Sequence, residues 1–333
     1  MRVLAIGATG SIGRHVVDLL AGQGHHIAVL HRGETVAALP EGVRKIRGNR
    51  NRLEDSRAVL ERFAPDVVLD LILYTEPQAR AMVKAFRGRA SRVVAVSSAD
   101  VYRNYDGFRG RVTPAPDAVP LAEDAPLRET RYVYRDESMS FEYSHDYEKI
   151  LVEHVVLSEP DLPATVLRLP AVYGPGDRQH RLRPYLQHMV DGRPAILLEE
   201  GQAGWRWTRG YVENVARAVA LAVTDAPSAH RIYNVGDEPT LTEREWVERI
   251  GAAAGWTGDV VTVSATGLPD QMRQPLDWQY DLWTDTRRIR SELGYVEPVS
   301  LDEAVRRTVD WERLELDGAT PLDYGDEDAK LDQ

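Results

Sequence analysis

A glycine-rich turn near the start of the chain constrains the fold most strongly. Gly7-Ala8-Thr9-Gly10-Ser11-Ile12-Gly13 follows an apolar run, Val3–Ile6, and opens an amphipathic stretch, Ile12–Leu20. Glycines let the backbone turn tightly and approach a pyrophosphate, and the free N–H groups of a helix N-terminus attract phosphate. The alternative is an ordinary structural turn. We predict a dinucleotide site whose cofactor contacts include Gly7, Thr9, Gly10, Ser11, Ile12 and Gly13.

Short apolar runs alternate with amphipathic stretches through the first half of the chain. The further strand-like runs are Ile27–Leu30, Val43–Ile46, Val67–Leu71, Val93–Val96 and Thr165–Leu169. The further helical patterns are Arg52–Phe63, Pro77–Phe86 and Asp146–Leu157. Apolar strands that alternate with helices indicate a parallel sheet covered on both faces. We therefore predict an α/β fold with a doubly wound parallel (Rossmann) sheet, which binds ligands at the carboxyl ends of its strands.

The second half of the chain has shorter and more mixed elements. We predict a Rossmann domain over 1–170, a smaller mixed α/β substrate domain over 171–312, and an acidic, loosely held tail over 313–333. Helical patterns span Tyr211–Val223 and Glu243–Ala254, and residues 211–236, with a strand at Arg231–Val235, return to the first domain. The proline-rich stretch Arg103–Arg135 lacks periodicity, as expected of a loop that covers a substrate.

Composition excludes several classes of function. The chain has no cysteine, so disulfides, thiolate metal centres and a cysteine nucleophile are excluded. The nine histidines lack ligand spacing, so we expect no metal site. The net charge of −11 argues against nucleic-acid binding. Because no apolar run approaches the ~20 residues of a membrane span and no signal-peptide pattern is present, we expect a soluble, cytoplasmic enzyme with a small-molecule substrate.

The residues after the second predicted strand bear on the choice of cofactor. An acid that holds the ribose 2′-hydroxyl of NAD is expected ~20 residues after the glycine turn. The sequence has His31-Arg32-Gly33 there. An arginine can pair with the 2′-phosphate of NADP and stack on adenine. We therefore favour NADP, with NAD as second choice, against a solvated surface role for Arg32. The nearby basic residues are interpreted as a solvated edge of the sheet: Arg44, Lys45, Arg47, Arg50 and Arg52.

Several segments together resemble the extended branch of the short-chain dehydrogenase/reductase superfamily, the NAD-dependent epimerase/dehydratase family. They are the Gly-x-x-Gly-x-x-Gly turn, Val93–Tyr102, Lys149 with Glu153, Arg168–Pro175 and Arg209–Ala216. The resemblance runs from residue 2 to about Glu312. It implies an NAD(P)-dependent oxidoreductase, epimerase or dehydratase that acts on a hydroxyl or carbonyl of a small molecule, possibly a sugar nucleotide. It also implies a homodimer built on the helices that begin near Pro77 and Asp146.

The resemblance assigns roles to individual residues. In the family a Ser or Thr positions the substrate oxygen, a Tyr passes its proton, and a Lys four residues later holds the ribose and stabilises the phenolate. Ser98 and Lys149 match two of these positions, and Asp100 lies where the dehydratases carry an acid for proton transfer. We expect further cofactor contacts from Asn49, Leu71 and Lys149, and substrate contacts from Ser98, Tyr102, Trp207 and the phosphate-binding Arg209.

The tyrosine position departs from the family pattern, because His145 lies four residues before Lys149. At ~100° per residue, His145 and Lys149 share a face of a regular helix, whereas Tyr147 and Tyr143 are rotated from Lys149 by about 200° and 120°. Three interpretations follow. His145 replaces the Tyr as acid/base; an irregular first turn brings Tyr143 or Tyr147 into the site; or the protein uses Tyr-free chemistry or is a dinucleotide-binding sensor or scaffold without redox turnover.

Overall fold

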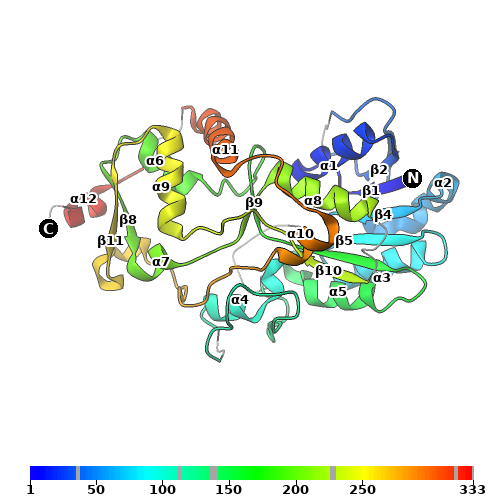
Figure 1. Cartoon of the computed structure of the whole chain (residues 1–333), viewed down its shortest axis with the longest axis horizontal. Coiled ribbons are helices and arrows are strands. Elements are labelled where there is room, and N and C mark those ends of the chain that lie inside the picture. The colour runs from blue at the N-terminus through cyan, green and yellow to red at the C-terminus, as the bar shows by residue number, and fades with distance from the viewer. Residues whose placement is uncertain (35–37, 112–113, 136–141, 226–229, 319–321, 332–333) are drawn as a thin grey trace.

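The computed structural model describes residues 1–34, 38–111, 114–135, 142–225, 230–318 and 322–331. The chain forms two lobes (Figure 1). The larger lobe holds the central sheet and the N-terminus, and the smaller lobe lies at the opposite end with the C-terminus. Residues 112–113 of the predicted covering loop and residues 319–321 and 332–333 of the predicted tail lie outside the described residues.

The larger lobe is built on seven parallel strands in the order β10-β6-β5-β4-β1-β2-β3. These are β1 (Arg2–Ile6), β2 (His26–His31), β3 (Arg44–Arg47), β4 (Val67–Asp70), β5 (Arg92–Ser98), β6 (Ala164–Leu169) and β10 (Arg231–Asn234). The strand order reverses between β1 and β4. Ligands of doubly wound sheets bind at this kind of switch point. The predicted fold class is confirmed.

Helices cover both faces of the sheet. On one face lie α1 (Ser11–Gly22), α8 (Val212–Thr224) and α10 (Arg287–Leu293), and on the other lie α2 (Arg57–Phe63), α3 (Glu76–Phe86) and α5 (Lys149–Leu157). Along β1, Val3 and Ala5 pack into the first layer, and Leu4 and Ile6 pack into the second. Because both faces are buried, the central strand β1 is apolar at consecutive positions, Val3–Ile6, rather than at alternate ones.

The smaller lobe surrounds a separate apolar core. It contains α6 (Arg183–Val190), β8 (Ala195–Glu199), α7 (Glu200–Gly204), α9 (Glu243–Ala254), β11 (Asp259–Val263) and α11 (Leu301–Leu316). Between the lobes, β7 (Ala171–Tyr173) pairs with β9 (Arg209–Tyr211), and α4 (Arg103–Phe108) opens the predicted covering loop. Within the described ranges, the helices are too short or too polar to span a bilayer, and acidic and His side chains form no group of three suited to a metal ion.

Two predicted helices differ from the structure. The pattern Arg52–Phe63 divides into a 3₁₀ helix, η1 (Arg50–Ser56), and α2, because Arg52 is non-helical (φ −140°, ψ 54°). The helix expected at Asp146–Leu157 begins three residues later, at Lys149.

The described part of the tail is docked rather than loosely held. α12 (Gly325–Leu331) packs beside α6, where Glu327 pairs with His188 at 3.0 Å. Tyr324 donates a hydrogen bond to Asp191, the residue that ends α6. Specific partners on α6 therefore offset the acidic, weakly patterned sequence of this segment.

Candidate active site

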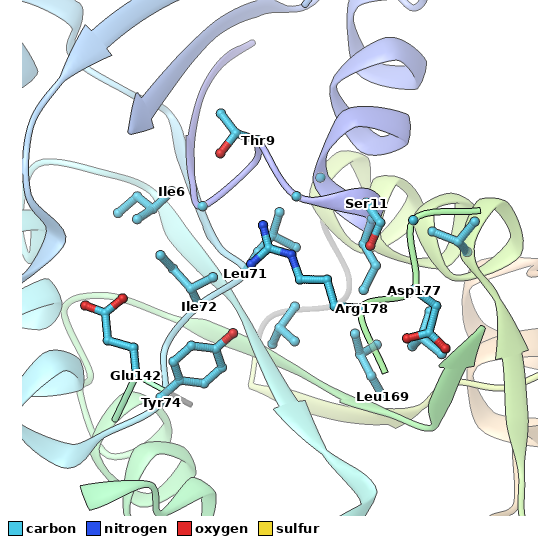
Figure 2. Close-up of a pocket in the computed structure, with 18 of the residues that line it drawn as sticks. Ile6, Thr9, Ser11, Leu71, Ile72, Tyr74, Glu142, Leu169, Asp177 and Arg178 are labelled. Carbon is cyan, nitrogen blue, oxygen red and sulfur yellow. The ribbon is translucent and has the colours of Figure 1, made fainter. Parts of the chain in front are cut away.

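A cavity of about 600 Å³ opens at the carboxyl edge of the sheet. It begins at the glycine turn, passes the ends of β2 and β4, and reaches the ends of β5 and β6 (Figure 2). The predicted cofactor contacts that line it are Gly7, Thr9, Gly10, Ser11, Ile12, Gly13, Arg32, Leu71 and Lys149. Ser98 also lines it, so one cavity joins the glycine turn to the predicted catalytic segment.

The glycine turn is shaped to receive a phosphate group. Gly7 has φ +78°, which disfavours any residue with a side chain. A Cβ on Gly13 would lie 2.4 Å from the Cα of Ala8, so α1 packs on the turn only if residue 13 is glycine. The N-cap Gly10 makes no side-chain cap bond, which leaves N–H groups of the first turn for an anion. These features fit the pyrophosphate of a dinucleotide.

One end of the cavity is formed by the residues after β2, including Arg32. We call it the adenosine end, because the adenosine of a dinucleotide is expected there. Arg32 forms ion pairs with Glu34 at 2.8 Å and Glu142 at 2.6 Å. The Arg32 side chain is 41% exposed, so these ion pairs lie open to an incoming phosphate. Arg47, at the end of β3, approaches the same place, because its Nε lies 3.5 Å from the position of a Cβ on Gly33.

The structure places two residues near this end differently from the sequence expectation. Arg50 is not part of a solvated edge, since its side chain is 4% exposed and pairs with the fully buried Asp70. Asn49 does not line the cavity. Its side chain instead caps η1 by accepting a hydrogen bond from the Asn51 N–H at 2.9 Å.

The segment before α5 explains how the site obtains a tyrosine. Glu148 is the N-cap of α5, and its carboxylate accepts the Ile150 N–H at 3.0 Å. Tyr147 (φ −64°, ψ 120°) and Glu148 (φ −158°, ψ 93°) are therefore extended rather than helical. In extended backbone, residues two apart point to the same side. Tyr147 and Lys149 accordingly both line the cavity.

The premise that placed His145 on the face of Lys149 is wrong, because no regular helix joins them. His145 lies in η3 (Ser144–Asp146), is 70% exposed, and contacts Asp146 at 3.0 Å. It does not line the cavity. Tyr143 does line it, but its hydroxyl accepts a hydrogen bond from Asn51 at 2.9 Å, near Glu142 and the adenosine end. Only Tyr147, of these three, lies beside Ser98 and Lys149.

Tyr147 and Lys149 are held in defined positions. The Tyr147 hydroxyl donates to Asp100 Oδ2 at 2.7 Å. Burial raises the pKa of the Tyr147 phenol, Asp100 raises it further, and a hydrogen bond with Ser98 lowers it. Lys149 Nζ donates to the carbonyls of Leu73 and Val96, both at 2.8 Å. Burial lowers the pKa of Lys149 to about 8, against the attraction of Asp100.

Three predicted substrate contacts lie off this cavity. Tyr102 is fully buried and bonds to Asn234 at 2.6 Å. Arg209 pairs with the buried Glu243, and its guanidinium stacks 4.5 Å from the Trp246 ring. Arg209 and Trp207 line a separate, much smaller pocket. Of the predicted substrate contacts, only Ser98 lines the large cavity.

Arg178 lines the cavity from the loop after β7, although it is not among the residues predicted from the sequence. Figure 2 shows its side chain pointing into the cavity, toward the side formed by Leu71 and Ile72. The signal was available in Gly174-Pro175-Gly176-Asp177-Arg178, where two glycines with positive φ shape the loop. The segment Arg168–Pro175, which carries part of the family resemblance, ends before Arg178 and does not include it.

The chain matches known proteins over most of its length. Residues 3–236 match the family model described as NAD dependent epimerase/dehydratase family. The 2'-dehydrokanamycin reductase of Streptomyces kanamyceticus is 29% identical over 82% of this chain and 72% of its own length. The UDP-glucose 4-epimerase of Mycolicibacterium smegmatis is 25% identical over 94% of this chain and 99% of its own.

Among solved structures, the UDP-glucose 4-epimerase of Thermus thermophilus in complex with NAD superposes with a TM-score of 0.67. The match has 22% identity and covers 96% of this chain and 100% of that one. Such a likeness supports the doubly wound fold seen here. The chain therefore belongs to the NAD dependent epimerase/dehydratase family, and it is an NAD(P)-dependent enzyme of the extended short-chain dehydrogenase/reductase type that acts on a hydroxyl or carbonyl of a small molecule.

Proposed function

We propose that the protein is an NADP(H)-dependent reductase that interconverts a carbonyl and a hydroxyl group, with Ser98, Tyr147 and Lys149 as its catalytic residues. The observation that carries the proposal is the extended backbone at Tyr147 and Glu148, which turns Tyr147 and Lys149 toward one cavity. That cavity starts at a glycine turn suited to a pyrophosphate.

Each catalytic residue has a distinct part. A bound nicotinamide supplies the hydride for reduction or accepts it for oxidation. Tyr147 passes a proton to or from the substrate oxygen, and Ser98, which hydrogen-bonds to Tyr147, orients that oxygen. The Lys149 ammonium, fixed on two carbonyls, supplies a positive charge near the reacting oxygen. The alternative of a dinucleotide-binding sensor or scaffold without redox turnover depends on the absence of a tyrosine from the site. Tyr147 supplies one, so this alternative loses its support.

Reduction is favoured over epimerisation of a sugar nucleotide by the state of Arg209. The family resemblance gives this residue the phosphate of a sugar nucleotide, yet its guanidinium is paired with Glu243 in a buried contact. Breaking such a pair costs several kcal/mol. The reductase from Streptomyces kanamyceticus is named for a substrate without a nucleotide.

The test follows the absorbance of the nicotinamide in mixtures of the protein and NADPH with either 2′-dehydrokanamycin or UDP-glucose. Consumption of NADPH with the ketone only would support a reductase. NADPH left unchanged by the ketone, while UDP-glucose is epimerised, would contradict it.

Cofactor binding is expected to depend on Gly13. Gly13→Ala forces a Cβ into the backbone of Ala8, and overpacking of this kind costs about 1–3 kcal/mol. The affinity for NADPH should fall about 10- to 100-fold in titration calorimetry. Gly22→Ala, in the last turn of the same helix, is the matched control, because its Cβ would meet nothing within 4 Å. Equal affinities of the two variants would place the pyrophosphate elsewhere.

The preference for NADP is expected to depend on Arg32. In Arg32→Asp, a third carboxylate joins Glu34 and Glu142, so a 2′-phosphate is repelled and a ribose hydroxyl gains an acceptor. The ratio of Kd for NADPH to Kd for NADH should rise at least tenfold. Arg57→Gln, whose guanidinium pairs only with Glu61 on α2 among the described contacts, should leave the ratio unchanged. A ratio unaltered in Arg32→Asp would refute the assignment.

A homodimer is proposed through α3 and α5, which lie side by side on one outer face of the larger lobe (Figure 1). The mass of the protein in solution, measured by light scattering, tests whether it is a dimer, and a mass of one chain would contradict the proposal.

A further inference from the structure

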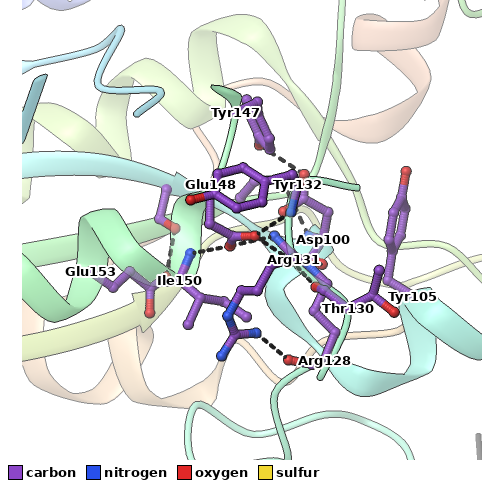
Figure 3. Close-up of polar contacts among 12 residues, drawn as sticks. Asp100, Tyr105, Arg128, Thr130, Arg131, Tyr132, Tyr147, Glu148, Ile150 and Glu153 are labelled. Carbon is purple, nitrogen blue, oxygen red and sulfur yellow. Dashed lines mark hydrogen bonds and ion pairs between the residues drawn. The ribbon is translucent and has the colours of Figure 1, made fainter. Parts of the chain in front are cut away.

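A chain of hydroxyl groups leads away from the proposed catalytic tyrosine. Tyr147 and Tyr134 both donate to Asp100 Oδ2, at 2.7 and 3.2 Å. The Tyr134 hydroxyl lies 3.0 Å from that of Tyr105. Figure 3 shows Tyr147 directed at Asp100, with Tyr105 on the other side of the carboxylate. Asp100 therefore connects Tyr147 to two residues of the covering loop that the proposed mechanism does not yet use.

Asp100 itself is an unusual group to bury. It is 7% exposed, and its Oδ1 atom has no hydrogen-bond partner within the described part of the structure. Among the described residues, no cation forms an ion pair with the Asp100 carboxylate. Arg128 donates a hydrogen bond to the main-chain carbonyl of Asp100 at 2.9 Å. Lys149 is close enough that the Asp100 charge raises its pKa, against the larger effect of burial. Among the described residues, the Asp100 carboxylate accepts side-chain hydrogen bonds only from hydroxyl groups, those of Tyr147 and Tyr134. Buried acids of this kind are often found where protons move.

We propose that Asp100 is the proton partner of Tyr147, and this inference rests on the proposed oxidoreductase function. During reduction, the hydride passes from the nicotinamide to the carbonyl carbon, and Tyr147 gives its proton to the carbonyl oxygen. The Asp100 carboxylic acid protonates the Tyr147 oxygen at the same time and becomes a carboxylate. Water then restores the Asp100 proton. During oxidation, the hydroxyl proton goes to Tyr147, and the Tyr147 proton goes to Asp100.

The position of Asp100 supports this transfer. A Tyr147 phenolate would lie 2.7 Å from an ionised Asp100, and two like charges so close in a buried site are strongly disfavoured. The pKa of Tyr147 is indeed raised by Asp100, in addition to the larger effect of burial. One negative charge shared between Tyr147 and Asp100 avoids this repulsion. Tyr134 and Tyr105, both partly exposed, provide the path by which water exchanges the proton.

The first experiment compares Asp100→Asn with Asp146→Asn in NADPH-dependent reduction of 2′-dehydrokanamycin. The amide keeps the shape of Asp100 but cannot exchange a proton, so kcat should fall about 100-fold or more, with the Kd for NADPH unchanged. Asp146 is exposed and contacts His145, so its variant should retain wild-type kcat. Tyr134→Phe interrupts the row of hydrogen-bonded hydroxyl groups. It should lower kcat less than Asp100→Asn does, and it should reduce the solvent deuterium isotope effect. Wild-type kcat in Asp100→Asn would overturn the proposal.

The second experiment needs no turnover. The ionisation of Tyr147 is followed by ultraviolet absorbance of the NADP⁺ complex, as the difference between each protein and its Tyr147→Phe counterpart. Removing the Asp100 charge should make Tyr147 ionise at lower pH in Asp100→Asn than in the wild type. The same ionisation in both proteins would show that the two groups are not coupled. Failure of the wild type to bind any nicotinamide cofactor would instead refute the proposed function, so the two failures are distinguishable.

Discussion

Tyr147→Phe is expected to lower kcat by about 10²- to 10⁴-fold, the usual worth of a positioned acid or base. The phenylalanine keeps the ring that packs against Tyr134, with centroids 5.1 Å apart, and loses only the hydroxyl that donates to Asp100. The Kd for NADPH should therefore be unchanged. The rate of hydride transfer is measured by absorbance of the nicotinamide in a single turnover.

His145→Ala is the matched variant, and it should retain wild-type kcat. Its side chain is 70% exposed, and among the described residues its one polar side-chain contact is with Asp146. Tyr143→Phe should likewise retain kcat, because its hydroxyl bonds to Asn51 at the adenosine end. A large loss of kcat in His145→Ala, with Tyr147→Phe active, would restore the interpretation in which histidine replaces the tyrosine.

The sequence predicts the fold well because local signals agree with the global arrangement. The apolar strands, the glycine turn and the helical periodicity each specify the doubly wound sheet. The cavity-lining residues of that turn follow for the same reason, since their positions depend on backbone geometry over only seven residues. Steric limits at Gly7 and Gly13 are local properties of the chain.

The sequence left Tyr147 as one of several alternatives, because the backbone that places it depends on distant contacts. A regular helix through His145 is reasonable from periodicity, but Glu148 is held by Arg128, twenty residues earlier, and this keeps Tyr147 extended. The same limit applies to Arg209, whose pairing with Glu243 on α9 has no local signal in the sequence. Such ion pairs join segments that are far apart in the sequence.

Removing the charge of Arg128 from its buried pair with Glu148 is expected to destabilise the protein strongly. Both side chains are fully buried, and the guanidinium donates to both carboxylate oxygens, at 2.8 and 2.9 Å. Arg128→Met leaves Glu148 buried without its cation, which costs about 3–5 kcal/mol of unfolding free energy. Urea denaturation measures this loss. Arg131→Met, on the exposed side of the same loop, should cost less than about 1 kcal/mol.

The double variant Arg128→Met/Glu148→Leu separates stability from the positioning of Tyr147. Replacing both members of a buried pair by apolar groups is often neutral, so most of the lost stability should return. Glu148 also caps α5 and accepts the Tyr132 N–H at 2.8 Å, and leucine supplies neither contact. The backbone that directs Tyr147 and Lys149 to one side is then no longer fixed, so kcat should stay low in a folded protein that binds NADPH normally. If kcat returned together with stability, Glu148 would serve folding alone, and another contact would have to hold Tyr147 extended.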